Sequence, residues 1–338
     1  MQIGRNNCLK KKHLLARCFF CPKFKISKQI SIAVSETISK NNILKGVFLV
    51  ALGATSYGML ATFVKLAYME NYTTAEVLTS QFTLGLLGLI LINFWQKTQK
   101  KTTVIKANSK DIKQLLLAGT STGFTGIFYY MAVKLDIPVS ICIVLLMQTV
   151  WMGVLLEMIL TKTLPSKRKI ASVIIVLVGT VLATNLINAD SNLSILGLVS
   201  GLLAAVSFTA TMYTANSIAL HISSAQRSLY MLIGGAMMVA IFALITQDRP
   251  FNFEIFVKWG IILSLFGTII PPLLLTAGFP KTGIGLGSIV SSLELPVSVL
   301  MAYFILNESV IALQWVGITM ILAAIVIMNM DLINFRKK

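Results

Sequence analysis

Long apolar runs separated by short polar segments dominate the chain. The runs recur with about 20 residues each, the length that an α-helix needs to cross a hydrocarbon layer of about 30 Å. This pattern predicts an all-α integral membrane protein with ten transmembrane helices. The predicted spans are residues 45–68, 74–95, 114–134, 138–160, 170–188, 195–216, 227–246, 258–279, 283–304 and 312–332.

Composition agrees with this pattern. The chain has 338 residues, of which 56% are hydrophobic and 12% are charged. The charged share is about half of the roughly 25% that is usual in soluble domains. Near the start, the segment HLLARCFF (13–20) is too short and too interrupted to be the apolar region of a signal peptide. We therefore expect a multi-pass protein of the cell (inner, cytoplasmic) membrane.

The net charge of +17 raises the question of nucleic-acid binding, and its distribution answers it. When the predicted spans are placed on alternate sides, 25 of the 29 Lys and Arg residues fall on the side that holds both termini. Loops such as MENYTTAE (69–76) on the other side contain none, and the remaining four basic residues are Lys65, Lys134, Arg249 and Lys258. The positive-inside rule then predicts cytoplasmic termini. The basic charge reports topology and gives no support for a nucleic-acid partner.

The two halves of the chain are similar to each other. At an offset of 146, IVLLMQTVW (143–151) aligns with IVSSLELPV (289–297), and at an offset of 151, residues 45–57 align with 196–208. An odd number of spans in each half means that the second half starts from the opposite face. Inverted repeats of this kind recur in transporters. We predict two inverted five-helix repeats, 43–188 and 193–332, flanked by basic cytoplasmic tails, 1–42 and 333–338.

Two motifs give the chain a family resemblance. GATSYGMLATFVK (53–65) and LELPVSVLMAYFILNESVIALQWVG (293–317) resemble the first helix and the last two helices of EamA-type members of the drug/metabolite transporter superfamily. The chain departs from the pattern in placing Leu295 between Glu294 and Pro296, and in having no proline near Gln148. The resemblance implies a membrane carrier, commonly an exporter of amino acids or other small metabolites.

Glu294 is the main candidate for substrate binding, because it lies near the centre of the ninth predicted span. A charged side chain at that depth costs a few kcal/mol, so it is usually retained for a cavity, a partner or a substrate. Burial also favours its protonated form, which makes it a candidate proton carrier. Pro296 removes a backbone donor beside it and is expected to break the helix. The alternative is a protonated Glu294 hydrogen-bonded to a neighbouring helix.

Further candidates share the same predicted depth. Those for substrate binding are Ser56, Tyr57, Gln148, Trp151, Ser207 and Phe208, and those for gating or helix breaks are Lys65, Pro271 and Pro272. Together they suit a pocket for a small amphipathic solute. Taken singly, each aromatic side chain is explained as well by helix packing, and Lys65 by its ammonium group reaching the interface.

The N-terminal tail contains a group of residues that superficially suggests zinc: Cys8, His13, Cys18 and Cys21. Their compact spacing among lysines does not match a zinc finger. We expect a disordered segment, loose attachment to anionic lipid or a misassigned start, and we predict neither metal nor cofactor. Cys142 stands alone within the spans, so no disulfide framework is expected.

Three classes of function compete at this stage. A secondary transporter working by alternating access, with a small-molecule substrate, the bilayer as its surroundings and possible proton coupling, fits the duplication. An intramembrane enzyme would need catalytic groups in the spans, but His13 and His221, the two histidines, lie in predicted cytoplasmic segments. A scaffold or channel subunit explains the internal duplication less directly. We therefore predict a transporter that is not an enzyme; its oligomeric state stays open.

Overall fold

The computed structural model describes residues 40–98, 105, 107–135, 137, 139–184, 194–307 and 309–333. The tail cysteines and His13, and nearly all of the predicted C-terminal tail, lie outside these residues. Residues 44–338 form one compact unit, and the description below concerns this unit.

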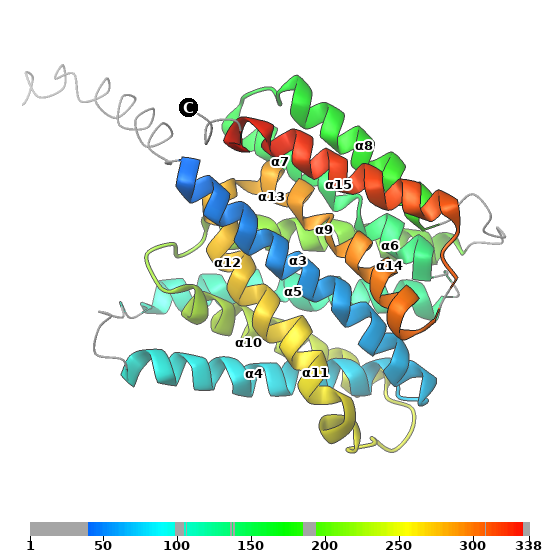
Figure 1. The fold of residues 1–338 in the computed structure, drawn as a ribbon. Coiled ribbons are helices and arrows are strands. Elements are labelled where there is room, and N and C mark those ends of the chain that lie inside the picture. Colours follow the sequence, from blue (N-terminus) through cyan, green and yellow to red (C-terminus); the bar gives the residue numbers. More distant parts are fainter. Residues whose placement is uncertain are drawn as a thin grey trace, which may run out of the picture. The chain divides into compact units, whose positions relative to one another are not determined.

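Within the described residues the fold is helical, with no strand (Figure 1). The elements are α3 (Lys40–Met69), α4 (Thr74–Thr98), α5 (Ser109–Lys134), α6 (Val139–Leu146), α7 (Thr149–Thr161), α8 (Lys167–Ala183), α9 (Ile195–Ser217), α10 (Ser224–Thr246), η2 (Phe256–Gly260), α11 (Ile261–Ser264), η3 (Leu265–Ile269), α12 (Ile270–Thr282), α13 (Ile284–Ser291), α14 (Glu294–Ile305) and α15 (Ala312–Ile333).

Eight helical segments in the described part of the chain are long and apolar enough to cross a membrane. They coincide with eight of the ten predicted spans, counting α6 with α7, η2 through α12, and α13 with α14 as single segments. The other two predicted spans are occupied by α5 and α8, which are not among the eight. α5 carries Lys110, Asp111 and Lys113 near its start, and α8 is 17 residues long. The protein is thus a multi-pass membrane protein, and the number ten stays a prediction.

Two broken helices occupy corresponding places in the chain. The turn at 147–148 separates α6, which has eight residues, from α7. The turn at 292–293 separates α13, which also has eight residues, from α14. At the predicted offset of 146, the two turns align to within one residue.

The first break forms without a proline. The backbone N–H of Gln148 donates to the carbonyl of Leu145 at 3.1 Å, so the carbonyl of Val144 loses its usual helical donor. The side-chain Nε2 of Gln148 donates to that carbonyl at 3.0 Å, and its Oε1 accepts from Nε1 of Trp151 at 2.9 Å. A side-chain amide therefore satisfies the groups that the break exposes.

Glycines allow α5 and α10 to touch along their backbones. A Cβ atom at Gly119 would overlap the carbonyl oxygen of Met231, and one at Gly234 would overlap the carbonyl oxygen of Leu116. Gly123 lies against Gly235 in the same crossing. Small residues at such positions are typical of helix packing in membranes. The α5–α10 pair forms a rigid centre between the predicted halves.

The compact unit has two ends, end A and end B. End A carries the loops at 70–73 and 247–255, which are joined through Glu76, a fully buried carboxylate. It accepts hydrogen bonds from the backbone N–H groups of Thr73 and Asn252, at 2.7 and 2.9 Å, and from Arg249 and Gln247, both at 3.3 Å.

End B carries the loops at 162–166 and 218–223. There Lys169 Nζ pairs with the Glu157 carboxylate at 2.5 Å. The Glu157 carboxylate lies against Gly283 and Gly285, beside the start of α13. His221 Nε2 and Asp111 Oδ2 are 3.1 Å apart at the same end. Both pairs hold helix ends together away from the middle of the bundle.

Candidate substrate cavity

A cavity of about 510 Å³ opens in the half of the bundle nearest end A. Its walls come from the second half of α3, the first half of α4, the second halves of α5 and α6, the end of α8, the middle of α9, η3, α14 with the segment that follows it, and the start of α15. The volume lies within the range of about 300–1,000 Å³ that is usual for small-molecule sites. The lining is mainly apolar and aromatic, with Tyr57, Tyr68, Tyr129, Tyr130 and Phe208 among its rings.

Glu294 lines this cavity at the first position of α14, directly after the second helix break. Close approach of α3 positions it: a Cβ atom at Gly58 would overlap the backbone carbonyl of Glu294. Tyr57 and Tyr129 lie near enough to interact with its charge. In the described part of the chain, the Glu294 carboxyl group makes no hydrogen bond and no ion pair. It is therefore available to a ligand.

Pro296 lies two positions further along α14 but does not line the cavity. Because proline has no N–H, the carbonyl of Ser292 accepts from the N–H of Leu295 instead, at 3.2 Å. The break and the proline thus turn the chain so that α14 starts at the cavity wall with Glu294 exposed to it.

The other predicted polar residues mostly support the wall from behind. Gln148 and Trp151 are absent from the lining, and Trp151 is 38% exposed on the bundle surface. Gln148 is bonded to Val144 and Trp151, as described above. For these two side chains, substrate contact stays a prediction.

Ser56 and Ser207 also lie outside the lining, and they make equivalent bonds across the molecule. Ser56 Oγ donates to the carbonyl of Phe266 at 3.1 Å, and Ser207 Oγ donates to the carbonyl of Ser121 at 3.2 Å. Each serine thus joins the first helix of one predicted repeat to the third helix of the other.

The carbonyl of Phe266 is available because of the prolines that follow it. The N–H of Ile270 donates to the carbonyl of Leu265, five residues back and so one residue further than in an α-helix, and Pro271 has no N–H to donate. Pro271 and Pro272 therefore distort this helix, as their sequence predicts, with the π-turn η3 directly before them. Ser56 supplies the missing donor.

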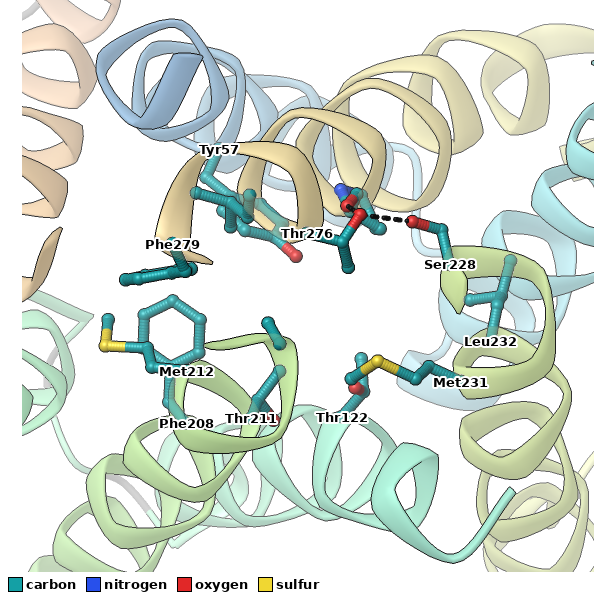
Figure 2. Close-up of a pocket in the computed structure, with 13 residues that line it drawn as sticks. Tyr57, Thr122, Phe208, Thr211, Met212, Ser228, Met231, Leu232, Thr276 and Phe279 are labelled. Atoms are coloured by element: carbon teal, nitrogen blue, oxygen red, sulfur yellow. Dashed lines mark hydrogen bonds between the residues drawn. The ribbon is translucent and has the colours of Figure 1, made fainter. Parts of the chain in front are cut away.

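Tyr57 and Phe208 separate the cavity from a second, smaller pocket. Their rings meet edge to face with centroids 6.2 Å apart. Both side chains line the large cavity and also the second pocket, which has about 30 Å³ and lies toward end B. Figure 2 shows this pocket, with Phe208, Met212 and Phe279 on one side and Ser228 and Leu232 on the other. Pro272 lines the small pocket, whereas Lys65, an exposed residue, lines the large cavity.

Gln81 and Tyr129 are two of the cavity residues that the sequence did not single out. Gln81 is 6% exposed, and its Oε1 is buried without a hydrogen-bond partner in the described part of the chain. Tyr129 lines the same cavity as Glu294, from α5. A polar side chain at the eighth position of an apolar span was a signal for Gln81, but nothing in the sequence indicates which face of the helix meets the cavity.

No group of three or more His, Cys, Asp or Glu side chains that could hold a metal ion occurs among the residues that the structure describes.

Comparison with known proteins agrees with the architecture. The model of the EamA-like transporter family matches the chain twice, over residues 44–185 and 195–330. A solved crystal structure has a similar fold, with a TM-score of 0.68 and 13% sequence identity over 82% of this chain and 96% of that one. No curated protein matches. A multi-pass helical bundle around a central cavity is the architecture of a membrane transporter. The chain belongs to the EamA-like transporter family.

Proposed function

We propose that the protein is a secondary transporter that exports amino acids or other small metabolites by alternating access. One observation carries this proposal. A carboxyl group without a protein partner, that of Glu294, faces a cavity of about 510 Å³ inside an apolar bundle. Intramembrane ionisable groups in such positions mark substrate or ion pathways.

The proposed architecture has ten spans in two inverted five-helix repeats, 43–188 and 193–332, between cytoplasmic tails. The two helix breaks and the bonds of Ser56 and Ser207 support the repeat, and the distribution of Lys and Arg supports the orientation. End A then faces the exterior of the cell membrane, and the cavity opens outward in this conformation.

The proposed binding site combines Glu294 with the rings of Tyr57, Tyr129 and Phe208. The Glu294 carboxylate would bind the ammonium group of a substrate, and the aromatic rings would cover its apolar part. Lys65, nearer end A, would meet a carboxylate on the same solute. Gln148, Trp151, Ser56 and Ser207 would hold the walls in place.

Proton coupling is part of this proposal. Glu294 would release its proton when the substrate binds and take one up after the substrate leaves. Transport would then depend on a pH gradient, and the protein itself would carry out no chemical conversion. Equal transport rates with and without a gradient, measured in proteoliposomes, would remove the coupling step.

The test is an accumulation and toxicity panel in cells that express the wild-type chain, Glu294→Gln or Glu157→Gln, with an empty-vector strain. The compounds are amino acids, their toxic analogues and organic cations. Glu157 is the matched control, because its carboxylate is paired with Lys169 outside the cavity. We expect the wild type and Glu157→Gln to lower accumulation of one compound class, and Glu294→Gln to behave like the vector. Equal activity of both variants would show that Glu294 is not in the site.

A further inference from the structure

The small pocket occupies the position that corresponds to the large cavity in the other repeat. Helices α3 and α9 align at an offset of 151, the one that pairs Ser56 with Ser207. At this offset Phe208, Thr211 and Met212, which line the small pocket, correspond to Tyr57, Leu60 and Ala61, which line the large cavity.

Helices α4 and α10 show the same relation. They align at an offset of 150, which pairs their first residues, Thr74 with Ser224, and also Gly85 with Gly235. The α10 residues of the small pocket, Ser228, Met231 and Leu232, then correspond to Leu78, Gln81 and Phe82, all of which line the large cavity. The large cavity and the small pocket are therefore formed by corresponding segments of the two repeats. The cavity at end A is wide, and the pocket at end B is narrow.

One residue makes the two ends different. Arg227 in the first turn of α10 corresponds to Val77 of α4 at this offset. Its guanidinium group is 3% exposed and donates Nε to the carbonyl of Ile218 at 2.9 Å, Nη1 to that of Thr276 at 2.7 Å, and Nη2 to that of Ala215. These carbonyls belong to the end of α9, the loop after it and α12.

Local structure leaves all three carbonyls available. Ala215 and Ile218 lie at the carboxyl end of α9, where helix carbonyls lack partners and the helix dipole favours a cation. The carbonyl of Thr276 would accept from residue 280 in a regular helix, but Pro280 has no N–H. Arg227 thus supplies the donors that α9 and α12 lack, and it ties the two helices together.

The bond between Ser228 and Thr276 reinforces this contact at the wall of the small pocket. Their hydroxyl oxygens are 2.9 Å apart (Figure 2). Among the described residues, no carboxylate pairs with Arg227, and the neighbouring charges of Lys45 and Lys281 have the same sign. The guanidinium group is therefore held by the carbonyls, and moving α12 away from α9 would leave it uncompensated.

We propose that the small pocket is the end-B half of the transport pathway, and that Arg227 is the latch that keeps it closed by bridging the end of α9 to Thr276 of α12. The proposal rests on the transport function above. Opening end B requires Arg227 to release Thr276, whereas the apolar side chain of Val77, at the equivalent position of end A, cannot form such a bridge. This difference accounts for a conformation that is open at end A.

Thiol labelling tests this without knowledge of the substrate. In a chain whose four cysteines are replaced by serine or alanine, Met231→Cys reports on the small pocket and Gln81→Cys on the equivalent place in the large cavity. A membrane-impermeant maleimide is applied from each side of the membrane, using right-side-out and inside-out vesicles. In this background, with Arg227 present, we expect fast labelling of Gln81→Cys from the side of end A and slow labelling of Met231→Cys from the side of end B.

Arg227→Gln should raise the labelling rate of Met231→Cys from the side of end B about tenfold, as expected when charge-assisted hydrogen bonds that favour one state are lost. The rate for Gln81→Cys should fall. Lys281→Gln is the matched control, because it removes the same charge at the same end, and the Lys281 Nζ bonds to the carbonyl of Ala277 in its own helix. Its rates should equal those of the unmodified background.

Pro280→Ala gives a second variant in case Arg227→Gln does not fold. The new N–H competes for the carbonyl of Thr276, so Met231→Cys labelling should rise by a smaller factor. Unchanged labelling in both variants would overturn the latch. If labelling responds but no compound in the panel is transported by the wild type, the latch stands and the proposed function fails. If transport is intact but Met231→Cys is never labelled from either side, the small pocket is not part of the pathway.

Discussion

The wide cavity at end A and the narrow pocket at end B are built from corresponding helices but differ in volume, about 510 against about 30 Å³. Corresponding positions carry different side chains. Val77 is a buried apolar residue at end A, whereas Arg227 at end B bridges three carbonyls. In the proposed mechanism, the duplication supplies both ends of the pathway, and the contacts of Arg227 keep end B closed.

End A has its own polar network, but it holds loops rather than the walls of the cavity. Glu76 joins the start of α4 to the segment after α10, and none of its partners lines the cavity. A closed loop network and an open cavity thus coexist at the same end.

Glu76→Ala is expected to have the largest effect on stability, because it removes this network and leaves two backbone N–H groups without an acceptor. We expect the free energy of unfolding to fall by about 3 kcal/mol. Glu70→Ala is the control, since Glu70 pairs with Lys258 in a contact in which both side chains are about half exposed. It should cost less than about 1 kcal/mol. Thermal unfolding in detergent measures both, and equal losses would contradict the role assigned to Glu76.

Gly119→Ala tests the α5–α10 crossing, in which α5 lines both the large cavity and the small pocket and α10 lines the small pocket. The new Cβ would overlap the carbonyl oxygen of Met231, so the helices must separate, at a cost of about 1–3 kcal/mol. Gly126→Ala in the same helix is the matched control, because its Cβ would lie 3.4 Å from Leu78 Cδ2. Size-exclusion profiles and melting temperatures should separate the two variants; similar behaviour would mean that the crossing can relax.

Substitutions at the two helix breaks are expected to have the smallest effects on stability. Gln148→Leu leaves the carbonyl of Val144 without its donor and should cost about 1–2 kcal/mol. Pro296→Ala adds an N–H that the carbonyl of Ser292 can accept, and should be neutral or slightly stabilising. The melting temperatures of the two variants test this. A larger fall in melting temperature for Pro296→Ala would show that the proline contributes more to stability at the breaks than the side-chain amide does.

Hydrophobic runs predicted the helices well, because a membrane span needs about 20 apolar residues whatever it packs against. They also singled out Glu294, which lines the cavity. They did not show which way a side chain faces, since spans that are apolar on every side carry no rotational signal. Gln148 and Trp151, for example, do not line the cavity.

Arg227 shows a second limit of sequence reasoning. It lies at the start of the seventh predicted span, on the side that holds both termini, and basic side chains at such positions usually meet solvent. Its burial depends on Pro280, 53 positions away, and on the end of α9. A contact of this kind follows from tertiary packing, which hydropathy does not contain.

The most direct test of the account is a reversible crosslink between α10 and α12. Ser228→Cys and Thr276→Cys replace two hydroxyl groups whose oxygens are 2.9 Å apart, in the cysteine-free background. Transport of a compound identified by the panel is measured after oxidation and again after reduction, with each single-cysteine variant as a control. We predict that oxidation stops transport by the double variant alone and that reduction restores it. Full transport by the oxidised, crosslinked protein would contradict the claim that end B opens between these helices.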